Sequence, residues 1–547
     1  MEPNTNKKPN SEYEELNSIK SNDLFKNLKN DYFLLKLFDY LQSKKKLEII
    51  KYNKYLQQRM NINIKNYKDF SELYSLIEIE IKPCNNKFFH FIHLENKDDE
   101  KYVHIYYNNN KEEEIKLNKL NVNYKVTKIN IIIDHQIKSF KDLFKYNECI
   151  ESLCFKKFYR NNINDISWMF SNCSSLKEIN LSNFNTNNVT NMSWMFYNCK
   201  NLKEINLSNF NTNNVTNMNG LFSGCSSLKE LNLSNFNTNN VTDLSGIFYG
   251  CSSLKEIDLS NFNTSKVTNI CSMFKGCSLL KKINLSNFNT KKVTRMDNMF
   301  YYCSSLKEID LSNFRTDNVN DMNSLFKGCS SLKKINICNF NTNNVTNLWN
   351  MFSGCSSLEE INLSNFNNNN VTNMSDMFNS CSSLKKLDLS NFNTNKVTDM
   401  RGMFEGCSSL IELNVSNFKT NNVTDMSSMF KRCSSLKKLD LSNFNTNNVG
   451  NMTNIFEGCS SLVELNVSNF NTNNINYMDN MFKNCSSLKE LNLSSFNTNH
   501  ILSFQGMFSG CPDELKKKIK TQLKNIKDEA FFEKPNKRNK YFQIIID

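Results

Sequence analysis

The chain has 547 residues, a net charge of +13 and a hydrophobic content of 39%, with 42 Phe, 21 Met and 19 Cys against only 13 Gly and 5 Pro. Its sequence contains no run near the ~18 apolar residues that a membrane-spanning helix needs, and the first ten residues, MEPNTNKKPN, lack the apolar segment of a secretory signal. This composition excludes collagen, membrane proteins and small disulfide-stapled domains, and it argues against complete disorder.

The N-terminal region divides into segments of different character. Residues 1–22 are expected to be a disordered tail. Residues 23–66 have helical apolar spacing, and residues 77–134 contain segments typical of strands, among them IEIEI and INIII. We therefore expect a small α+β region over residues 23–124.

One helical segment, Phe33–Leu56, resembles an F-box in part. The apolar pairs Phe33-Leu34 and Leu37-Phe38 have the expected spacing, but an early Pro is missing and Tyr55-Leu56 stand where a Trp is usual. An ordinary helical cap is the favoured interpretation, because such apolar patterns are common in helices. An F-box that recruits substrates to a ubiquitin ligase stays open as an alternative.

From residue 169 to residue 511 the sequence repeats every 26 residues without insertion or deletion. A typical unit, residues 225–250, reads CSSLKELNLSNFNTNNVTDLSGIFYG. The ladder cysteines recur once per unit: Cys173, Cys199, Cys225, Cys251, Cys277, Cys303, Cys329, Cys355, Cys381, Cys407, Cys433, Cys459, Cys485 and Cys511. Such a period indicates a solenoid of stacked coils, and the Phe column from Phe184 to Phe496 is expected to be buried in it.

The first half of each unit predicts a short strand followed by a polar turn. Leu176, Ile179 and Leu181 have the L-x-x-L-x-L spacing of a leucine-rich repeat, and alternation with polar neighbours points them inward. Phe184 and Val189 anchor the turn SNFNTNNV between them. Its amide side chains are expected to form hydrogen-bonded ladders from coil to coil.

The second half of each unit predicts a short helix. Met192, Met195, Phe196 and Cys199 follow the i, i+3, i+4, i+7 spacing of one helical face, and Thr190 precedes them as a candidate N-cap. The residue before the ladder Cys is Gly in most units and Asn in three. Both residues suit a left-handed C-cap.

Both ends of the array are expected to be capped. Leu143–Trp168 is a degenerate first unit in which Asn147 replaces the ladder Cys, and Lys125–Phe140 reads as a half-unit or strand that joins the array. At the other end, Asp513–Ala530 places its apolar residues on one helical face. These residues are Leu515, Ile519, Leu523 and Ile526.

The repeated units, of the form LxxInLSNFNTnnVTnMsxMFxgCSS, resemble BspA-like leucine-rich repeats, the bacterial surface protein family with a 26-residue repeat. The resemblance covers about Leu143 to Cys511. It implies a leucine-rich-repeat coil, a cell-surface or adhesive role, and no catalytic residues that could be carried over. This chain departs from the surface members because a signal peptide, a lipobox Cys and an anchor are not seen in it.

The expected fold is an α/β solenoid. Each 26-residue turn of this leucine-rich-repeat coil contributes a short parallel strand and a short helix, and a small N-terminal α+β cap precedes the first turn. The expected boundaries place the solenoid at residues 125–511 and a C-terminal capping helix and tail at residues 512–547.

The exposed strand positions form the candidate interaction face. Their charge alternates over nine units from Glu256 to Glu464, which would place each carboxylate between two ammonium groups. Register and solubility of the array are the favoured role, and ligand binding is the alternative. The face comprises Glu178, Asn180, Glu204, Asn206, Glu230, Asn232, Glu256, Asp258, Lys282, Glu308, Lys334, Glu360, Lys386, Glu412, Lys438 and Glu464.

The remaining reactive residue types give no pattern of catalysis. Stacked turns ~4.8 Å apart would permit disulfides between ladder cysteines, but buried thiols packed as small hydrophobes explain an uninterrupted column better. His90 and His93 would lie on opposite faces of a strand, so a zinc site is not expected. The sequence has no GxxxxGK[ST], HExxH or GxSxG motif, and we expect no catalytic residue, metal or cofactor.

Together these patterns predict a non-enzymatic protein–protein interaction scaffold. A surface adhesin and an F-box-type substrate receptor are the alternatives. We expect a protein partner and a monomeric, cytoplasmic chain. Specific nucleic-acid binding is not expected, because Arg is scarce and no basic-aromatic groove motif is visible.

Overall fold

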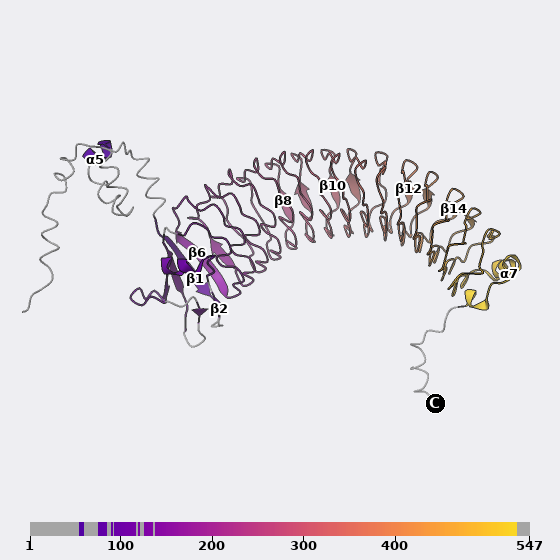
Figure 1. The fold of residues 1–547 in the computed structure, drawn as a ribbon, viewed down its shortest axis with the longest axis horizontal. Coiled ribbons are helices and arrows are strands. Elements are labelled where there is room, and N and C mark those ends of the chain that lie inside the picture. The colour runs from indigo at the N-terminus through magenta and orange to yellow at the C-terminus, as the bar shows by residue number, and fades with distance from the viewer. Residues whose placement is uncertain are drawn as a thin grey trace, which may run out of the picture.

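The computed structural model describes most of the chain as one continuous stack of coils. In Figure 1 these coils form a curved rod that runs from the sheet of β1 (Ile77–Pro83) and β6 (Ile150–Lys157) to helix α7 (Asp513–Gln522). The described residues are 54–59, 75–84, 89–90, 92–115, 119–120, 125–134 and 137–532.

Only the last three residues of the F-box-like segment, 54–56, are among the described residues. The tail at 1–22 lies outside them. Within residues 54–59, helix α5 (Lys54–Arg59) buries Leu56. The structure therefore leaves the F-box prediction untested.

A five-stranded sheet leads into the solenoid. Its order is β3 (Val103–Tyr107), β5 (Ile129–Ile133), β1, β6 and β7 (Glu178–Asn180). The first three pairings are antiparallel, whereas β6 and β7 pair in parallel, as successive coils do. The strand that leads into the first coil is therefore β6, and β5, from the segment expected to join the array, lies two strands away. A separate antiparallel pair joins β2 (Phe89–His90) to β4 (Lys119–Leu120).

Strands of three residues recur along the solenoid, and Figure 1 shows them following one another along the rod. They pair in parallel two at a time, β8 with β9, β10 with β11, β12 with β13 and β14 with β15. They are β8 (Glu256–Asp258), β9 (Lys282–Asn284), β10 (Glu308–Asp310), β11 (Lys334–Asn336), β12 (Lys386–Asp388), β13 (Glu412–Asn414), β14 (Lys438–Asp440) and β15 (Glu464–Asn466). A second line of parallel bridges runs from Asp165 to Ser503, one residue per coil.

The expectation of a short helix in each unit is wrong, because two consecutive tight turns occupy its place in the described coils. In the unit at Cys199, the N–H of Met195 donates to the carbonyl of Met192 at 3.3 Å and that of Cys199 to Phe196 at 3.1 Å. Trp194 and Asn198, the third residues of these turns, have φ angles of 58° and 56°. Each pattern is a β-turn with a left-handed third residue.

The backbone amides of these turns explain why no helix forms. The N–H of Trp194 donates to Asn219 of the next coil at 2.8 Å, and that of Phe196 to Leu221 at 3.0 Å. Thr190, the expected N-cap, instead donates its N–H to Asn164 of the preceding coil at 2.8 Å. Hydrogen bonds that a helix would close internally thus join neighbouring coils.

The expected left-handed residue before the ladder Cys is present, but it belongs to a turn. Gly354 has a φ of 76°, and an added Cβ would lie 3.3 Å from the Cα of Gly328 in the preceding coil. A side chain at this position would therefore strain both its own backbone and the contact between coils.

Two columns of Phe rings fill the core. All members of the column from Phe184 to Phe496 are buried, which confirms that prediction. A second column runs from Phe144 to Phe508, where neighbouring rings stack with centroids 5.4 to 6.2 Å apart. The core is therefore continuous from coil to coil.

The ladder cysteines are buried free thiols. Each Sγ donates to a Phe carbonyl at 3.0 to 3.2 Å, as Cys199 does to Phe170. Burial raises the pKa of the Cys251 thiol to about 12. The thiol proton is thus retained in the core at neutral pH.

The C-terminal segment covers the open end of the last coil. The side chain of Gln522 on α7 accepts from the N–H of Leu493 at 3.0 Å and donates to the carbonyl of Leu491 at 3.1 Å. Phe531 stacks on Phe508 with centroids 5.6 Å apart. The backbone and ring contacts of a further coil are therefore supplied by residues 513–532.

Candidate functional site

The strand-face ribbon consists of the exposed first and third residues of each coil's strand segment. All sixteen residues of the expected interaction face are exposed, while the apolar residue between them points inward. Five of them lie in segments that are not assigned as strand, so a strand in every unit is not observed: Glu204, Asn206, Glu230, Asn232 and Glu360. The structure therefore places the ribbon on one face without testing its role.

The ribbon is grouped in blocks of two coils, a feature that sequence reasoning missed. A coil with Asp at its third strand position pairs with the following coil that has Asn there, as Asp258 does with Asn284. The same arrangement holds at Asp310, Asp388 and Asp440. The recurrence of Asp among Asn residues at this position, at intervals of 52 or 78 residues, was the available signal.

Two ion pairs lie inside these blocks. Lys386 contacts Glu412 at 2.8 Å, and Lys438 contacts Glu464 at 2.7 Å. Among the described ribbon residues, no ion pair joins Glu412 to Lys438 across the block boundary. Each of these carboxylates therefore has one ammonium partner, and the expected placement between two is not realised.

The Asp side chains of the ribbon close tight turns. The backbone N–H of Ser260 donates to Asp258 at 2.9 Å and holds the pKa of that carboxyl below its usual range. Backbone N–H groups two residues further on lower the pKa of Asp310, Asp388 and Asp440 in the same way. These carboxylates are fixed negative charges at neutral pH.

An open groove of about 1050 Å³ follows the ribbon over the coils from Glu230 to Asn336. Its lining combines acidic residues such as Asp258 and Asp310 with Lys282 and Lys334. The groove offers charges of both signs and polar side chains to an extended ligand.

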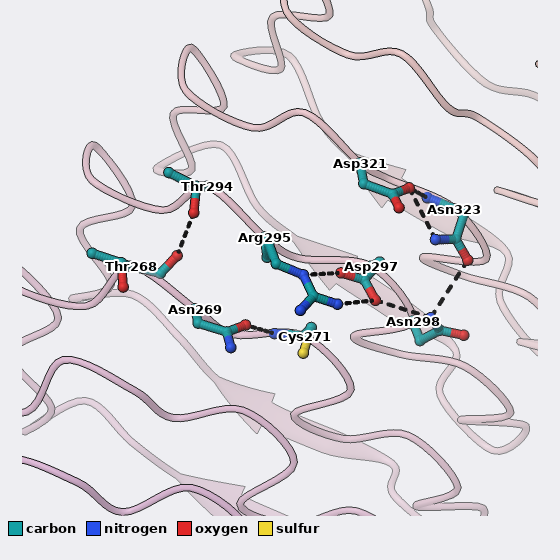
Figure 2. Close-up of polar contacts among 9 residues, drawn as sticks. All are labelled: Thr268, Asn269, Cys271, Thr294, Arg295, Asp297, Asn298, Asp321 and Asn323. Atoms are coloured by element: carbon teal, nitrogen blue, oxygen red, sulfur yellow. Dashed lines mark hydrogen bonds and ion pairs between the residues drawn. The ribbon is translucent and has the colours of Figure 1, made fainter. Parts of the chain in front are cut away.

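The two tight turns before the ladder Cys of each coil form one side of the rod, here called the turn edge. A polar cluster interrupts the repeat on this edge (Figure 2). Asn269 and Asp321 each accept the backbone N–H two residues further on, from Cys271 at 3.1 Å and Asn323 at 2.9 Å. In the coil between them Arg295 stands at this position and donates two hydrogen bonds to Asp297, at 3.2 and 3.3 Å. The buried carboxylate thus has its counter-ion, which is a structural role.

A column of alternating side chains on the turn edge was also missed from the sequence. The residue two before each ladder Cys reads Tyr249, Lys275, Tyr301 and Lys327 in four successive coils. Lys275 lies over both tyrosine rings, at 5.8 Å from the centroid of Tyr249 and 4.5 Å from that of Tyr301. Reading that position at the 26-residue spacing would have revealed the column.

The metal-ligating residue types do not gather at one place in the described residues. These residues contain no group of three or more His, Cys, Asp or Glu residues that could hold a metal ion. Burial, together with the nearby Asp297 charge, raises the pKa of the half-buried Cys271, which makes it a poor nucleophile. The helices of the described ranges are also too short or too polar to cross a membrane.

Comparison with known proteins finds one family along the solenoid. Its sequence profile, described as "Mycoplasma protein of unknown function, DUF285", matches residues 136–254, 164–282, 226–335, 305–412, 329–439 and 409–522. No curated protein sequence matches the chain significantly.

Several solved structures are similar at low sequence identity. A leucine-rich cell surface protein of Faecalibacterium prausnitzii is 17% identical over 62% of this chain and 89% of its own, with a TM-score of 0.32. InlJ of Listeria monocytogenes, whose functional domain "includes a cysteine ladder", is 15% identical over 66% and 69%, with a TM-score of 0.18. TLR13, in a complex with ssRNA13, is 18% identical over 59% and 56%, with a TM-score of 0.17. None of these likenesses assigns a function to this chain.

Proposed function

We propose that this chain, which belongs to the family of BspA-like 26-residue repeats described as "Mycoplasma protein of unknown function, DUF285", is a non-enzymatic protein-interaction scaffold. The strand-face ribbon is the proposed binding face. A partner surface with complementary charges would meet it in register with the coils.

The observation that carries this proposal is the fixed arrangement of exposed charges along the ribbon. Lys386 and Glu412 form an ion pair within one block, and backbone N–H groups orient Asp388 and Asp440. Charge patterns of this kind favour a particular partner and register more than they raise affinity. A protein surface can match such a two-sign pattern over several coils.

Photo-crosslinking in the native cell tests the proposal. A photoreactive amino acid at Asn362, on the ribbon, should capture a partner protein that the same group at Asn369, in the polar turn of that coil, does not. The purified partner should then lose about ten-fold in affinity when Lys282 and Lys334, which line the groove and form no ion pair among the described residues, are both changed to Glu. Equal capture at both positions, or unchanged affinity, would contradict the proposal.

We also propose a cytoplasmic, unglycosylated protein. Six Asn residues that head Asn-Val-Thr sequons donate their side-chain amide to a carbonyl of the preceding coil, at 2.5 to 2.9 Å. A glycan on these nitrogens would remove contacts between coils. They are Asn188, Asn214, Asn240, Asn344, Asn370 and Asn422.

Mass spectrometry of the native protein tests this location. We expect all six asparagines unmodified and the ladder thiols reduced, since buried free thiols suit a reducing compartment. N-glycans on several of them would contradict a cytoplasmic location and favour the surface adhesin. The F-box alternative has no supporting observation among the described residues.

A further inference from the structure

We propose that the chain has a second interaction surface, the edge patch, which binds an acidic segment of a partner polypeptide. The edge patch lies on the turn edge of five successive coils and does not overlap the strand-face ribbon. Its residues are Tyr249, Lys275, Tyr301, Tyr302, Lys327 and Trp349.

Lysine side chains of the edge patch are held between aromatic rings. Lys275 lies between Tyr249 and Tyr301, and Lys327 lies 5.9 Å from the centroid of Tyr301 and 5.7 Å from that of Trp349. Cation–π contacts of this kind keep the ammonium groups in defined positions. A partner would therefore lose little entropy in ordering these lysines.

Three of the four aromatic side chains of the edge patch are exposed. Tyr302 is 50% exposed, Tyr249 42% and Trp349 41%. At other coils the residues before the ladder Cys are mostly Ser, Gly, Asn or charged residues. Exposed Tyr and Trp beside cations are the side chains that dominate protein interfaces energetically.

The same column shows why the partner should be acidic. In later coils Lys431 lies 3.6 Å from Glu405 and 3.4 Å from Glu457, so its charge is already neutralised within the chain. In the part of the chain that the structure describes, neither Lys275 nor Lys327 has a carboxylate within ion-pair distance. Their positive charges remain available to carboxylates of a partner.

The ring arrangement favours a polypeptide over single-stranded nucleic acid. Bases stack on open aromatic faces, but Lys275 and Lys327 both lie over the ring of Tyr301. The assignment of a polypeptide as the ligand rests on the proposed function, namely that the chain binds proteins.

Fluorescence anisotropy of the full chain tests the edge patch. The probe is a labelled dodecapeptide that repeats Glu-Glu-Leu. Lys275→Gln together with Lys327→Gln should weaken its binding about ten-fold or more, and Tyr302→Ser should weaken it as well. The matched control Lys431→Gln, at the same position of another coil, should leave the affinity within about two-fold, because that charge is already paired.

Three outcomes would overturn this inference. The first is an equal effect of the control and the double variant, with thermal unfolding showing both to be folded. The second is tighter binding of an oligothymidylate of the same charge than of the peptide. The third is loss of peptide binding only in the ribbon variant Lys386→Gln, which would leave the proposed scaffold intact.

Discussion

At the scale of single residues, the ladder cysteines combine burial with a hydrogen bond that an apolar side chain cannot make. The carbonyl of Phe170 accepts both the N–H of Cys173 at 3.1 Å and the Sγ–H of Cys199 at 3.2 Å. The sequence predicted the burial, since the column is uninterrupted. The hydrogen bond could not be predicted, because it depends on a turn carbonyl that a helix would have used internally.

The buried thiols predict a loss of stability at alkaline pH. In the unfolded chain a ladder thiol has its ordinary pKa of 9.0, whereas burial in the folded chain raises the pKa of six of these thiols to about 12. Above pH 9 the unfolded chain therefore binds fewer protons than the folded one. Each thiol then lowers the free energy of unfolding by about 1.4 kcal/mol per pH unit. The six thiols with this value are Cys173, Cys251, Cys329, Cys407, Cys459 and Cys511.

Denaturant unfolding at a series of pH values measures this effect. Because a typical domain is stable by only ~5–15 kcal/mol, we expect cooperative unfolding between about pH 9 and pH 11. The variant Cys251→Ala should show a shallower decrease than the unchanged chain. A free energy of unfolding that stays level up to about pH 11 would disprove the role of the thiols.

Substitutions of two glycines distinguish the cost of a strained backbone from the effect of reduced chain flexibility. Gly354→Ala should cost about 1–2 kcal/mol, because its φ is 76° and the new Cβ would meet Gly328 at 3.3 Å. Gly450→Ala should be neutral or stabilise by about 0.4–1 kcal/mol, since nothing lies within 4 Å of its added Cβ. Thermal unfolding checks both variants, and equal costs would refute the left-handed turn.

At the scale of elements, the apolar spacing in the second half of each unit is compatible with a short helix and with two consecutive turns. Met192, Met195, Phe196 and Cys199 are all buried, as a helix would require. Two turns bury the same four residues and leave alternate amides to bond the next coil. Periodicity alone does not separate these two structures, because the decision depends on hydrogen bonds to a neighbour 26 residues away.

The cap made by α7 predicts local loosening when Gln522 is removed. Gln522→Ala would leave the buried N–H of Leu493 and the carbonyl of Leu491 without their partner, at a cost of about 1–3 kcal/mol. In a solenoid each coil contacts only its neighbours. Hydrogen exchange should therefore quicken in residues 485–511 and stay unchanged in the central coils.

The control for this cap is Lys518→Ala on the same helix. It removes only an exposed ion pair with Glu490 at 3.3 Å, so an effect below about 0.5 kcal/mol is expected. Faster exchange along the whole solenoid in the Gln522 variant would show that the end coil is not an independent cap.

At the scale of the whole molecule, the coils form one rod with a finer two-coil order. In the Phe column from Phe184 to Phe496, Phe288 and Phe314 of neighbouring blocks stack at 6.0 Å. Phe314 and Phe340, which belong to the paired coils of β10 and β11, form no such stack among the described residues. The sequence predicted the period, the inward residues and the exposed ribbon. The two-coil order and the edge patch emerge only when residues 26 or 52 positions apart are brought side by side.

Deletion of one whole unit tests most directly whether the 26-residue coil is the structural unit of this molecule. Removing residues 350–375 should leave a cooperatively folding chain, because every column regains its register. Removing only residues 350–362 should abolish cooperative unfolding, because the Phe and Cys columns on the two sides no longer meet. Thermal unfolding of the two deletions by circular dichroism gives the answer: cooperative unfolding of the half-unit deletion at the temperature of the unchanged chain would contradict the coil architecture.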